Sequence, residues 1–164
     1  MKPVTEQDIR ASFVNCSKGD AKRLAVPRDL AERRWDQLDF LGWRDPAAPD
    51  RGYIVAEHGD RLVGVALRSA SGNRGFLRRS MCSLCLTTHS GDGVSLMAAP
   101  RAGKAGREGN TVGIYACSDL DCSLYLRGIK TAGPGGRLHE SLTLDEQVAR
   151  TTAALAAFVD NLLS

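Results

Sequence analysis

The sequence predicts an α+β fold, in which N-terminal helices and a small antiparallel sheet pack with a cysteine-rich unit and a closing C-terminal helix. Three observations lead to this prediction. Apolar residues recur at helical spacing near both ends, strand-like runs lie between them, and four of the five cysteines form two close pairs. Because 164 residues are enough for one core, we expect a single domain spanning residues 1–164.

Two helices are expected before the sheet. Thr5 can cap the first, which should run to about Val14 with Ile9 and Phe13 on one face. The second is expected from about residue 27 or 28 to residue 41, because one apolar stripe comprises Ala31, Trp35 and Leu38. Gly42 is expected to cap the end of that helix, and Asp45-Pro46 to prevent its continuation. Trp43 is expected to pack on the core.

The segments expected to be strands are 53–56, 62–67, 94–97 and 111–115. His58-Gly59-Asp60 is a hairpin signal between the first two, and a polar, glycine-rich loop at 101–110 joins the last two. For the closing helix, Thr143 and Glu146 form a capping-box pattern. Its apolar face is expected to comprise Leu144, Val148, Leu155, Phe158 or Val159, and Leu162.

The paired cysteines are the most specific feature of the chain. Cys82 and Cys85 are separated from Cys117 and Cys122 by 31 residues. A C-x-x-C turn presents two sulfurs to one tetrahedral ion, and a second pair brought to the same place completes a Cys₄ shell without room for water. The pattern therefore predicts one structural zinc ion. Disulfides and ordinary buried thiols are the alternatives.

The elements around the cysteines predict a treble-clef zinc finger at about residues 80–130. A knuckle with the first pair, a hairpin and a helix with the last two ligands in its opening turn follow in that order. Ser118 is expected to cap this helix, and Asp121 to place a carboxylate in its first turn. The residues expected to face inward are Leu120, Leu124 and Ile129.

Charge and terminal sequence limit the function classes. Residues 68–130 hold nine basic and four acidic residues, a surplus of five, which falls to about +3 once four thiolates bind Zn²⁺. Such a surface suits an acidic protein or a phosphate backbone. No run is long enough to cross a membrane, and the N-terminal residues show no signal-peptide pattern, so we expect a cytoplasmic protein.

Few residues are candidates for catalysis. His58, His89 and His139 are expected at the surface, with His89 as the reserve metal ligand if one cysteine does not bind. Cys16 is expected to be a buried or half-buried thiol. The segment 103–106 lacks the serine or threonine that a phosphate-binding loop requires after its lysine. We therefore expect no enzymatic activity and no small-molecule substrate, and an enzyme is the third alternative.

Two motifs carry a family resemblance. Residues 81–85 and 115–122, with a hairpin between them, resemble the C-terminal treble-clef domain of the elongation factor G-binding, FusB-type family, in its actinobacterial stand-alone form. Residues 38–46 and 51–53 fit the αβ part of the same domain. The resemblance implies a zinc site formed by Cys82, Cys85, Cys117 and Cys122.

The resemblance also implies a function. In that family the finger binds elongation factor G on or near the ribosome, through basic and aromatic side chains around the third and fourth cysteines. The corresponding stretches here contain Lys104, Arg107, Tyr115, Tyr125, Arg127 and Lys130. The resistance proteins carry an N-terminal helical bundle with no counterpart here, so the resemblance implies factor binding and modulation of translation rather than drug resistance. The alternative is a zinc finger that binds ribosomal RNA or another nucleic acid.

Overall fold

The computed structural model describes residues 1–69 and 76–164. Its main element is a five-stranded antiparallel sheet in the order β1-β2-β3-β6-β7. The strands of this sheet are β1 Leu41–Arg44, β2 Arg51–His58, β3 Arg61–Ser69, β6 Val94–Pro100 and β7 Thr111–Cys117. A separate antiparallel pair consists of β4 (Phe76–Met81) and β5 (Thr88–Gly91).

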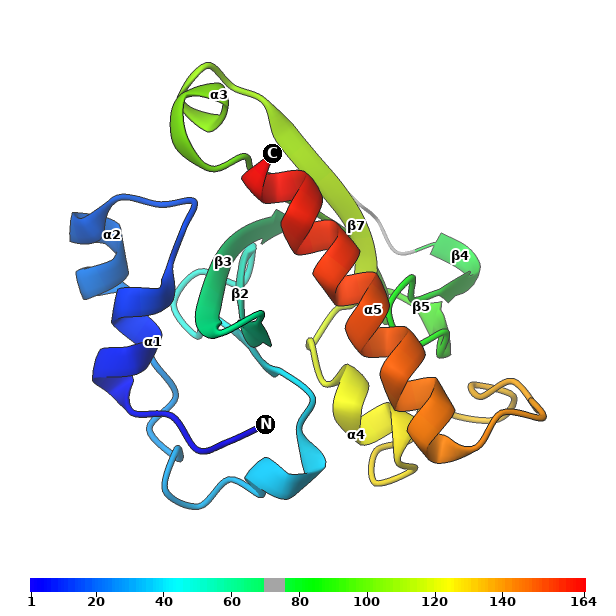
Figure 1. Ribbon diagram of the computed structural model, residues 1–164. Helices are drawn as coiled ribbons and strands as arrows, with labels where there is room; N and C mark the ends of the chain where they lie inside the picture. Colours follow the sequence, from blue (N-terminus) through cyan, green and yellow to red (C-terminus); the bar gives the residue numbers. More distant parts are fainter. Residues whose placement is uncertain (70–75) are drawn as a thin grey trace.

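Helices lie on both sides of the large sheet. They are α1 Glu6–Ser12, α2 Lys18–Arg23, α3 Gly103–Arg107, α4 Cys122–Leu126 and α5 Leu144–Leu163, with a short 3-10 helix η1 at Trp35–Gln37. In Figure 1, α5 runs along β7, and α1 lies beside β3. These elements confirm the predicted α+β class with a closing C-terminal helix. Among the described residues, no helix is both long and apolar enough to span a membrane.

Alternate residues of β2 belong to two different cores. Tyr53 and Val55 share a core with Ile9 of α1, whereas Ile54 shares a core with Leu155 of α5. Successive side chains of a strand point to opposite faces, so the sheet separates two apolar layers. We call them the α1 core and the α5 core. The α5 core also contains the two cysteine pairs.

The first helix forms with the predicted cap, but it ends at Ser12, so Phe13 lies just outside it. The Thr5 hydroxyl accepts a hydrogen bond from the Asp8 N–H, and the Asp8 carboxylate accepts one from the Thr5 N–H, at 3.2 and 2.8 Å. Beyond the helix, Phe13 pairs with Gly64 of β3. A Cβ at Gly64 would lie 2.5 Å from the Ser12 hydroxyl oxygen, so glycine is what lets the chain pass this close to the sheet.

The helix predicted over residues 27–41 is wrong. The segment holds turns and η1, and its last residue already begins β1. Its apolar stripe has another cause, because Trp35 and Leu38 are buried in the α1 core from an irregular backbone. Gly42 is not a helix cap either. It lies in β1, where a Cβ would come within 2.6 Å of the Leu120 Cβ and carbonyl oxygen.

Residues around this segment serve the sheet instead. Trp43 is buried in the α1 core as expected, and its indole N–H donates to the Ala25 carbonyl at 2.8 Å. Asp45 does not end a helix. It is buried in the turn after β1 and accepts a hydrogen bond from the Tyr53 hydroxyl at 3.2 Å. The sequence analysis missed α2, although Ser17 caps it with its hydroxyl.

The predicted strands and the closing helix are present in the structure. All four predicted strands lie within β2, β3, β6 and β7. The glycine-rich loop at 101–110 includes α3, and the capping box of Thr143 and Glu146 opens α5. The inward face of α5 differs at one end, because Leu144 is exposed. Its buried apolar residues are Leu155, Phe158, Val159 and Leu162.

Candidate metal centre

The fold brings the two cysteine pairs together. The Sγ atoms of Cys82, Cys85, Cys117 and Cys122 all lie within 4.8 Å of one another, and all four residues are buried. The Sγ of Cys82 is 3.7 Å from that of Cys122, and the Sγ of Cys85 is 3.6 Å from that of Cys117. The cluster lies between the knuckle, the end of β7 and the start of α4.

These separations fit a metal and exclude disulfides. A disulfide requires sulfur atoms about 2.05 Å apart, and all five cysteines are free thiols. Zinc–sulfur bonds of about 2.3 Å in a regular tetrahedron place the sulfurs about 3.8 Å apart. The two shortest separations therefore match edges of a Zn(Cys)₄ tetrahedron, and four soft sulfur donors suit Zn²⁺.

The first pair sits on a tight turn between β4 and β5. The Leu84 N–H donates to the Cys82 sulfur at 3.4 Å, and the Leu86 N–H donates to the Cys82 carbonyl at 3.0 Å. Leu86 has a φ of 57°, a left-handed conformation that costs energy in a residue with a branched side chain. The Ser83 N–H donates to the Tyr115 carbonyl at 2.7 Å, which fastens this turn to β7.

The second pair lies where β7 leads into α4. The prediction that Ser118 caps the helix is wrong, because α4 begins later, with Asp121 at the capping position and no side-chain cap. The Ser118 hydroxyl instead lies 2.6 Å from the Ser95 hydroxyl of β6. Leu120 is buried as predicted, but Ile129 is exposed. Leu120 also has a left-handed backbone, with a φ of 63°.

His89 was expected at the surface and is instead buried beside the cluster, with only 6% of its surface exposed. Its Nε2 lies 3.3 Å from the Cys117 sulfur, and its ring meets that of Tyr125 edge-on at 4.7 Å. Space for the ring depends on Gly93, where a Cβ would lie 2.4 Å from the His89 Cβ. The sequence contains no periodic signal for this placement, since it depends on the pairing of β5 with β4.

Polar groups around the sulfurs complete the site. The His89 ring nitrogen faces Cys117, the Leu84 N–H faces Cys82, and the Thr87 hydroxyl lies 3.2 Å from the Cys85 sulfur. The Cys85 thiol donates to the Thr87 hydroxyl, and the Leu84 N–H donates to the Cys82 sulfur. Such hydrogen bonds orient the sulfurs toward a metal, and N–H donors also stabilise thiolates. His89 thus fits the role of a hydrogen-bonding neighbour of a sulfur.

The thiols of the cluster influence one another. Hydrogen bonds from the thiols of Cys117 and Cys122 lower the pKa of Cys82 and that of Cys85. Zinc binds thiolates and displaces the protons of thiols. The pKa of Cys117 and that of Cys122 are raised by the same coupling, so the four thiols do not all ionise together without a counter-charge. A divalent cation would balance the negative charge that accumulates when all four are thiolates.

A polar network holds the turn between Cys117 and α4. Asp119 accepts hydrogen bonds from the Tyr125 hydroxyl and from Lys130, both at 2.7 Å, and Lys130 also donates to Asp121 at 2.7 Å. Burial lowers the pKa of Lys130, but the bonds to the two carboxylates outweigh it and raise the pKa above its usual value. Burial and the bond to Asp119 raise the pKa of Tyr125.

Besides the strands β6 and β7, which belong to the large sheet, the finger contacts the chain around β1 and β2. Arg127 and Asp39 form a bidentate ion pair, with both N–O distances at 2.7 Å. Leu120 packs against Gly42 of β1 and also lies next to Gly52 of β2. Glycine at both strand positions is what allows this contact.

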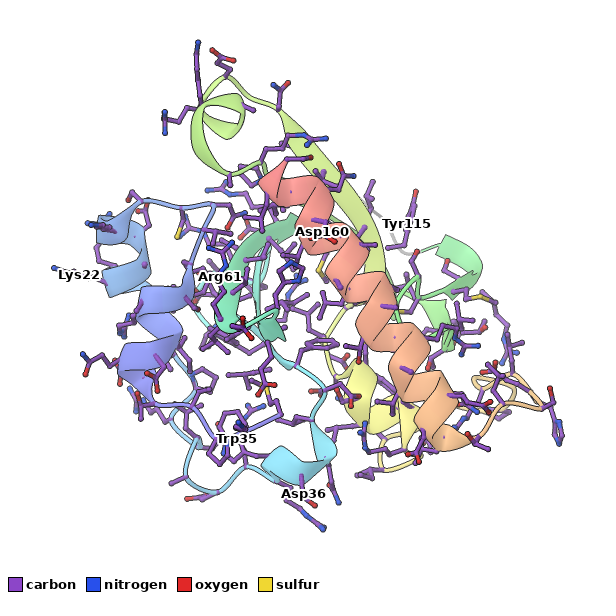
Figure 2. All side chains as sticks on the ribbon, in the orientation of Figure 1. Lys22, Trp35, Asp36, Arg61, Tyr115 and Asp160 are labelled. Carbon is purple, nitrogen blue, oxygen red and sulfur yellow. The ribbon has the colours of Figure 1, made fainter. Side chains whose placement is uncertain are left out.

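The structure divides the six candidate partner residues into two groups. Tyr125, Arg127 and Lys130 make the internal bonds described above. Lys104 and Arg107 lie in α3 at the far end of the β6–β7 hairpin, and both are exposed. Tyr115 projects from β7 and is 44% exposed (Figure 2). The two groups therefore lie in different parts of the finger.

The remaining candidates for chemistry, which are His58, His139 and Cys16, lie outside the cluster of four cysteines. His139 is exposed, as expected, whereas His58 is half-buried and lies 3.0 Å from Asp160 of α5. Cys16 is half-buried, and burial raises the pKa of its thiol. A raised pKa makes a thiol a poor nucleophile at neutral pH.

The hairpin and the cysteine cluster define a treble-clef zinc finger with one structural zinc site. A family model described as "FBP C-terminal treble-clef zinc-finger" matches residues 8–162, so the chain belongs to this family. The solved structure of the fusidic acid resistance protein FusC is similar, with a TM-score of 0.55 and 19% sequence identity over 75% of this chain and 52% of that one. The chain thus spans about half of FusC, and the likeness concerns the fold. No curated protein matches the sequence.

Proposed function

We propose that this protein binds elongation factor G, with its zinc finger as the contact platform, and thereby modulates translation on or near the ribosome. The observation that carries the proposal is the family match over residues 8–162. The FusB-type family resembled by the cysteine motifs binds this factor, and FusC shares the fold. The proposal concerns binding and does not extend to drug resistance.

The metal has a structural part in this proposal. We assign one Zn²⁺ to Cys82, Cys85, Cys117 and Cys122, and we treat residues 1–164 as one FBP-type domain with its finger at about 80–130. The burial of the four sulfurs and their mutual proximity support a closed site. Strained turns at Leu86 and Leu120 support it too, because such backbone persists only where its surroundings hold it.

The β6–β7 hairpin is firmly held at both ends. Near the knuckle, Ser83 binds the Tyr115 carbonyl. Near the tip, the Ala102 N–H donates to the Leu162 carbonyl of α5 at 2.9 Å, and Arg101 donates to the Asn161 side chain at 2.9 Å. A surface held in this way loses little conformational freedom on binding. This supports the hairpin as a binding surface.

Three of the candidate residues suit contact with a partner. Tyr115 offers an exposed ring on a rigid strand, which is the usual character of an interface anchor. Lys104 and Arg107 place positive charge at the hairpin tip, where it can speed association with an acidic surface. We propose Tyr125, Arg127 and Lys130 as residues that shape the finger and contribute to binding mainly through that shape.

Calorimetry with purified elongation factor G tests the proposal. Zinc-loaded protein should bind the factor. Tyr115→Ala should weaken binding by about 2 kcal/mol or more, and Lys104→Ala by well under 1 kcal/mol. Tyr125→Phe is the matched control, because it keeps the ring and removes a hydroxyl that is already bonded to Asp119. Absence of binding at about 50 µM would contradict the proposal.

The same titration distinguishes the ribosomal RNA alternative. Binding dominated by phosphate contacts weakens steeply and linearly on a log–log plot against salt, whereas a mixed protein interface responds less. The basic hairpin tip is the observation that keeps this alternative in view. A steep salt slope with ribosomal RNA, together with no binding to the factor, would favour it.

A further inference from the structure

A second feature lies on the α1 side of the sheet, away from the cysteines. A cavity of about 340 Å³ opens between α2 and the ends of β2 and β3. Three arginines line it, one from each of these elements: Arg23, Arg51 and Arg68. Its walls also include apolar surface from Leu24 and Pro100.

Two of the arginines form an unfavourable pair. Arg51 of β2 lies directly opposite Arg68 of β3 in the register of the two strands. Directly opposed residues of antiparallel strands point to the same face, and like charges there destabilise the sheet. Within residues 1–69 and 76–164, neither guanidinium has a carboxylate oxygen within 4.0 Å.

The two carboxylates that line the cavity are already engaged. Asp20 pairs with Arg23 at 2.8 Å. Asp45 accepts hydrogen bonds from the Tyr53 hydroxyl and from the N–H groups of Ala47 and Ala48, at 3.2, 2.9 and 3.2 Å. These bonds hold Asp45 in the turn between β1 and β2, where it forms no ion pair with either arginine. With three arginines and two aspartates, the lining of the cavity carries a net positive charge.

We propose that this cavity binds a small phosphomonoester between Arg51 and Arg68. A dianion there removes the repulsion between the two guanidinium groups. Guanidinium forks donate paired hydrogen bonds to phosphate oxygens, which a lysine ammonium cannot do. The volume lies at the lower end of small-ligand sites and accommodates a phosphate with a compact organic group against Leu24 and Pro100. This site lies away from the cysteine cluster, although Pro100 at the end of β6 forms part of its wall.

Phosphorus-31 NMR titration of the zinc-loaded protein tests the proposal, with inorganic phosphate and a nucleoside 5′-monophosphate as probes. Both should bind, and an excess of the unphosphorylated nucleoside should not displace either of them. The double variant Arg51→Gln/Arg68→Gln should bind at least tenfold more weakly. Its melting temperature without phosphate should equal or exceed that of the parent, because the like-charge contact is gone.

Arg61→Gln is the matched control. Arg61 lies in β3, at the other end of the strand from Arg68. It is exposed and outside the cavity lining (Figure 2). It should leave phosphate binding unchanged. If the double variant does not fold, Arg68→Gln alone serves, since it removes one of the two forks and should still weaken binding severalfold.

Three results would overturn the proposal. They are no binding of either probe by the parent protein, equal binding by the parent and the arginine variants, and equal loss in the Arg61→Gln control. An oligonucleotide without a terminal phosphate distinguishes the source of the ligand. If it binds as tightly as the monophosphate, the site takes backbone phosphodiesters, and the assignment to a phosphomonoester is wrong.

Discussion

The two sides of the sheet are stabilised in different ways. The α1 core consists of aromatic and aliphatic side chains, including Trp35, Trp43 and Tyr53. In the α5 core, four buried cysteines lie among apolar side chains such as Ile54 and Leu155. We expect burial of apolar surface to stabilise the first side, and burial together with the free energy of metal binding to stabilise the second. The proposed partner surface belongs to the finger, the segment whose fold we expect to depend on zinc.

The largest effect is expected from a change that removes the zinc site and leaves the α1 core intact. Cys82→Ser should lose the zinc ion and unfold the finger, because structural zinc sites contribute roughly 10–16 kcal/mol of apparent binding free energy. Elemental analysis and circular dichroism measure the two effects. Cys16→Ser is the control and should keep one zinc per chain, since Cys16 lies outside the cluster. Full zinc content in Cys82→Ser would contradict the ligand assignment.

The next change breaks the apolar side alone. Trp43→Ala removes a buried indole from the α1 core and its hydrogen bond to Ala25. We expect a loss of about 3–5 kcal/mol in the free energy of unfolding, measured by urea denaturation. Zinc content should stay at one per chain. A loss below about 1 kcal/mol would show that this core stabilises the fold less than its burial indicates.

A third change tests the ion pair between Arg127 of the finger and Asp39, which precedes β1. Asp39→Ala leaves Arg127 without its buried partner, so we expect a loss of about 3 kcal/mol in unfolding free energy. Asp36→Ala is the matched control, because Asp36 is exposed and lies in η1 nearby (Figure 2). It should change stability by less than about 0.5 kcal/mol. Equal effects of the two variants would mean that the ion pair does not fasten the end of α4 to the segment before β1.

A smaller effect is expected at the groups around the sulfurs. His89→Gln removes the imidazole beside Cys117 and should weaken zinc affinity roughly tenfold to a hundredfold, as for other hydrogen-bonding neighbours of ligands. Competition with a chromophoric chelator measures this. The exposed His139→Gln is the control and should not change affinity. Unchanged affinity in His89→Gln would leave His89 with a packing role only.

The smallest effect concerns the start of α5, the helix that packs on the α5 core. Thr143→Ala removes the capping hydroxyl and should cost about 1 kcal/mol, seen as a lower melting temperature. Thr152→Ala is the control, because its exposed hydroxyl bonds only to the helix's own Val148 carbonyl. That variant should be neutral or slightly stabilising. A neutral Thr143→Ala would show that packing alone determines where α5 begins.

Local patterns in the sequence predicted the parts of the fold that depend on local interactions. The caps at Thr5 and Thr143, the hairpin at 58–60 and the cysteine spacing all act over a few residues, and each identified its element. The helix predicted at 27–41 failed because Trp35 and Leu38 pack at helical spacing from an irregular chain. Tertiary contacts decided that segment, and periodicity cannot detect them.

The site shows the same division. The cluster of four cysteines could be predicted from spacing, whereas the burial of His89 could not. Its place follows from the pairing of β5 with β4 and from the missing Cβ of Gly93, which only the folded chain brings together. The engagement of Arg127 by Asp39 likewise joins residues 88 positions apart. The family resemblance had made Arg127, a basic residue just beyond the fourth cysteine, a candidate for partner contact.

Hydrogen exchange of the zinc-loaded and the chelated protein tests the contrast between the two sides most directly. The account predicts that, after chelation, amides of the finger at about 80–130 lose their protection, while amides of β2 and β3 keep most of theirs. Loss of protection throughout the chain would contradict it by showing that the α1 core does not stand without the metal. Unchanged protection in the finger would also contradict it, because zinc would then contribute nothing to the stability of the proposed binding surface.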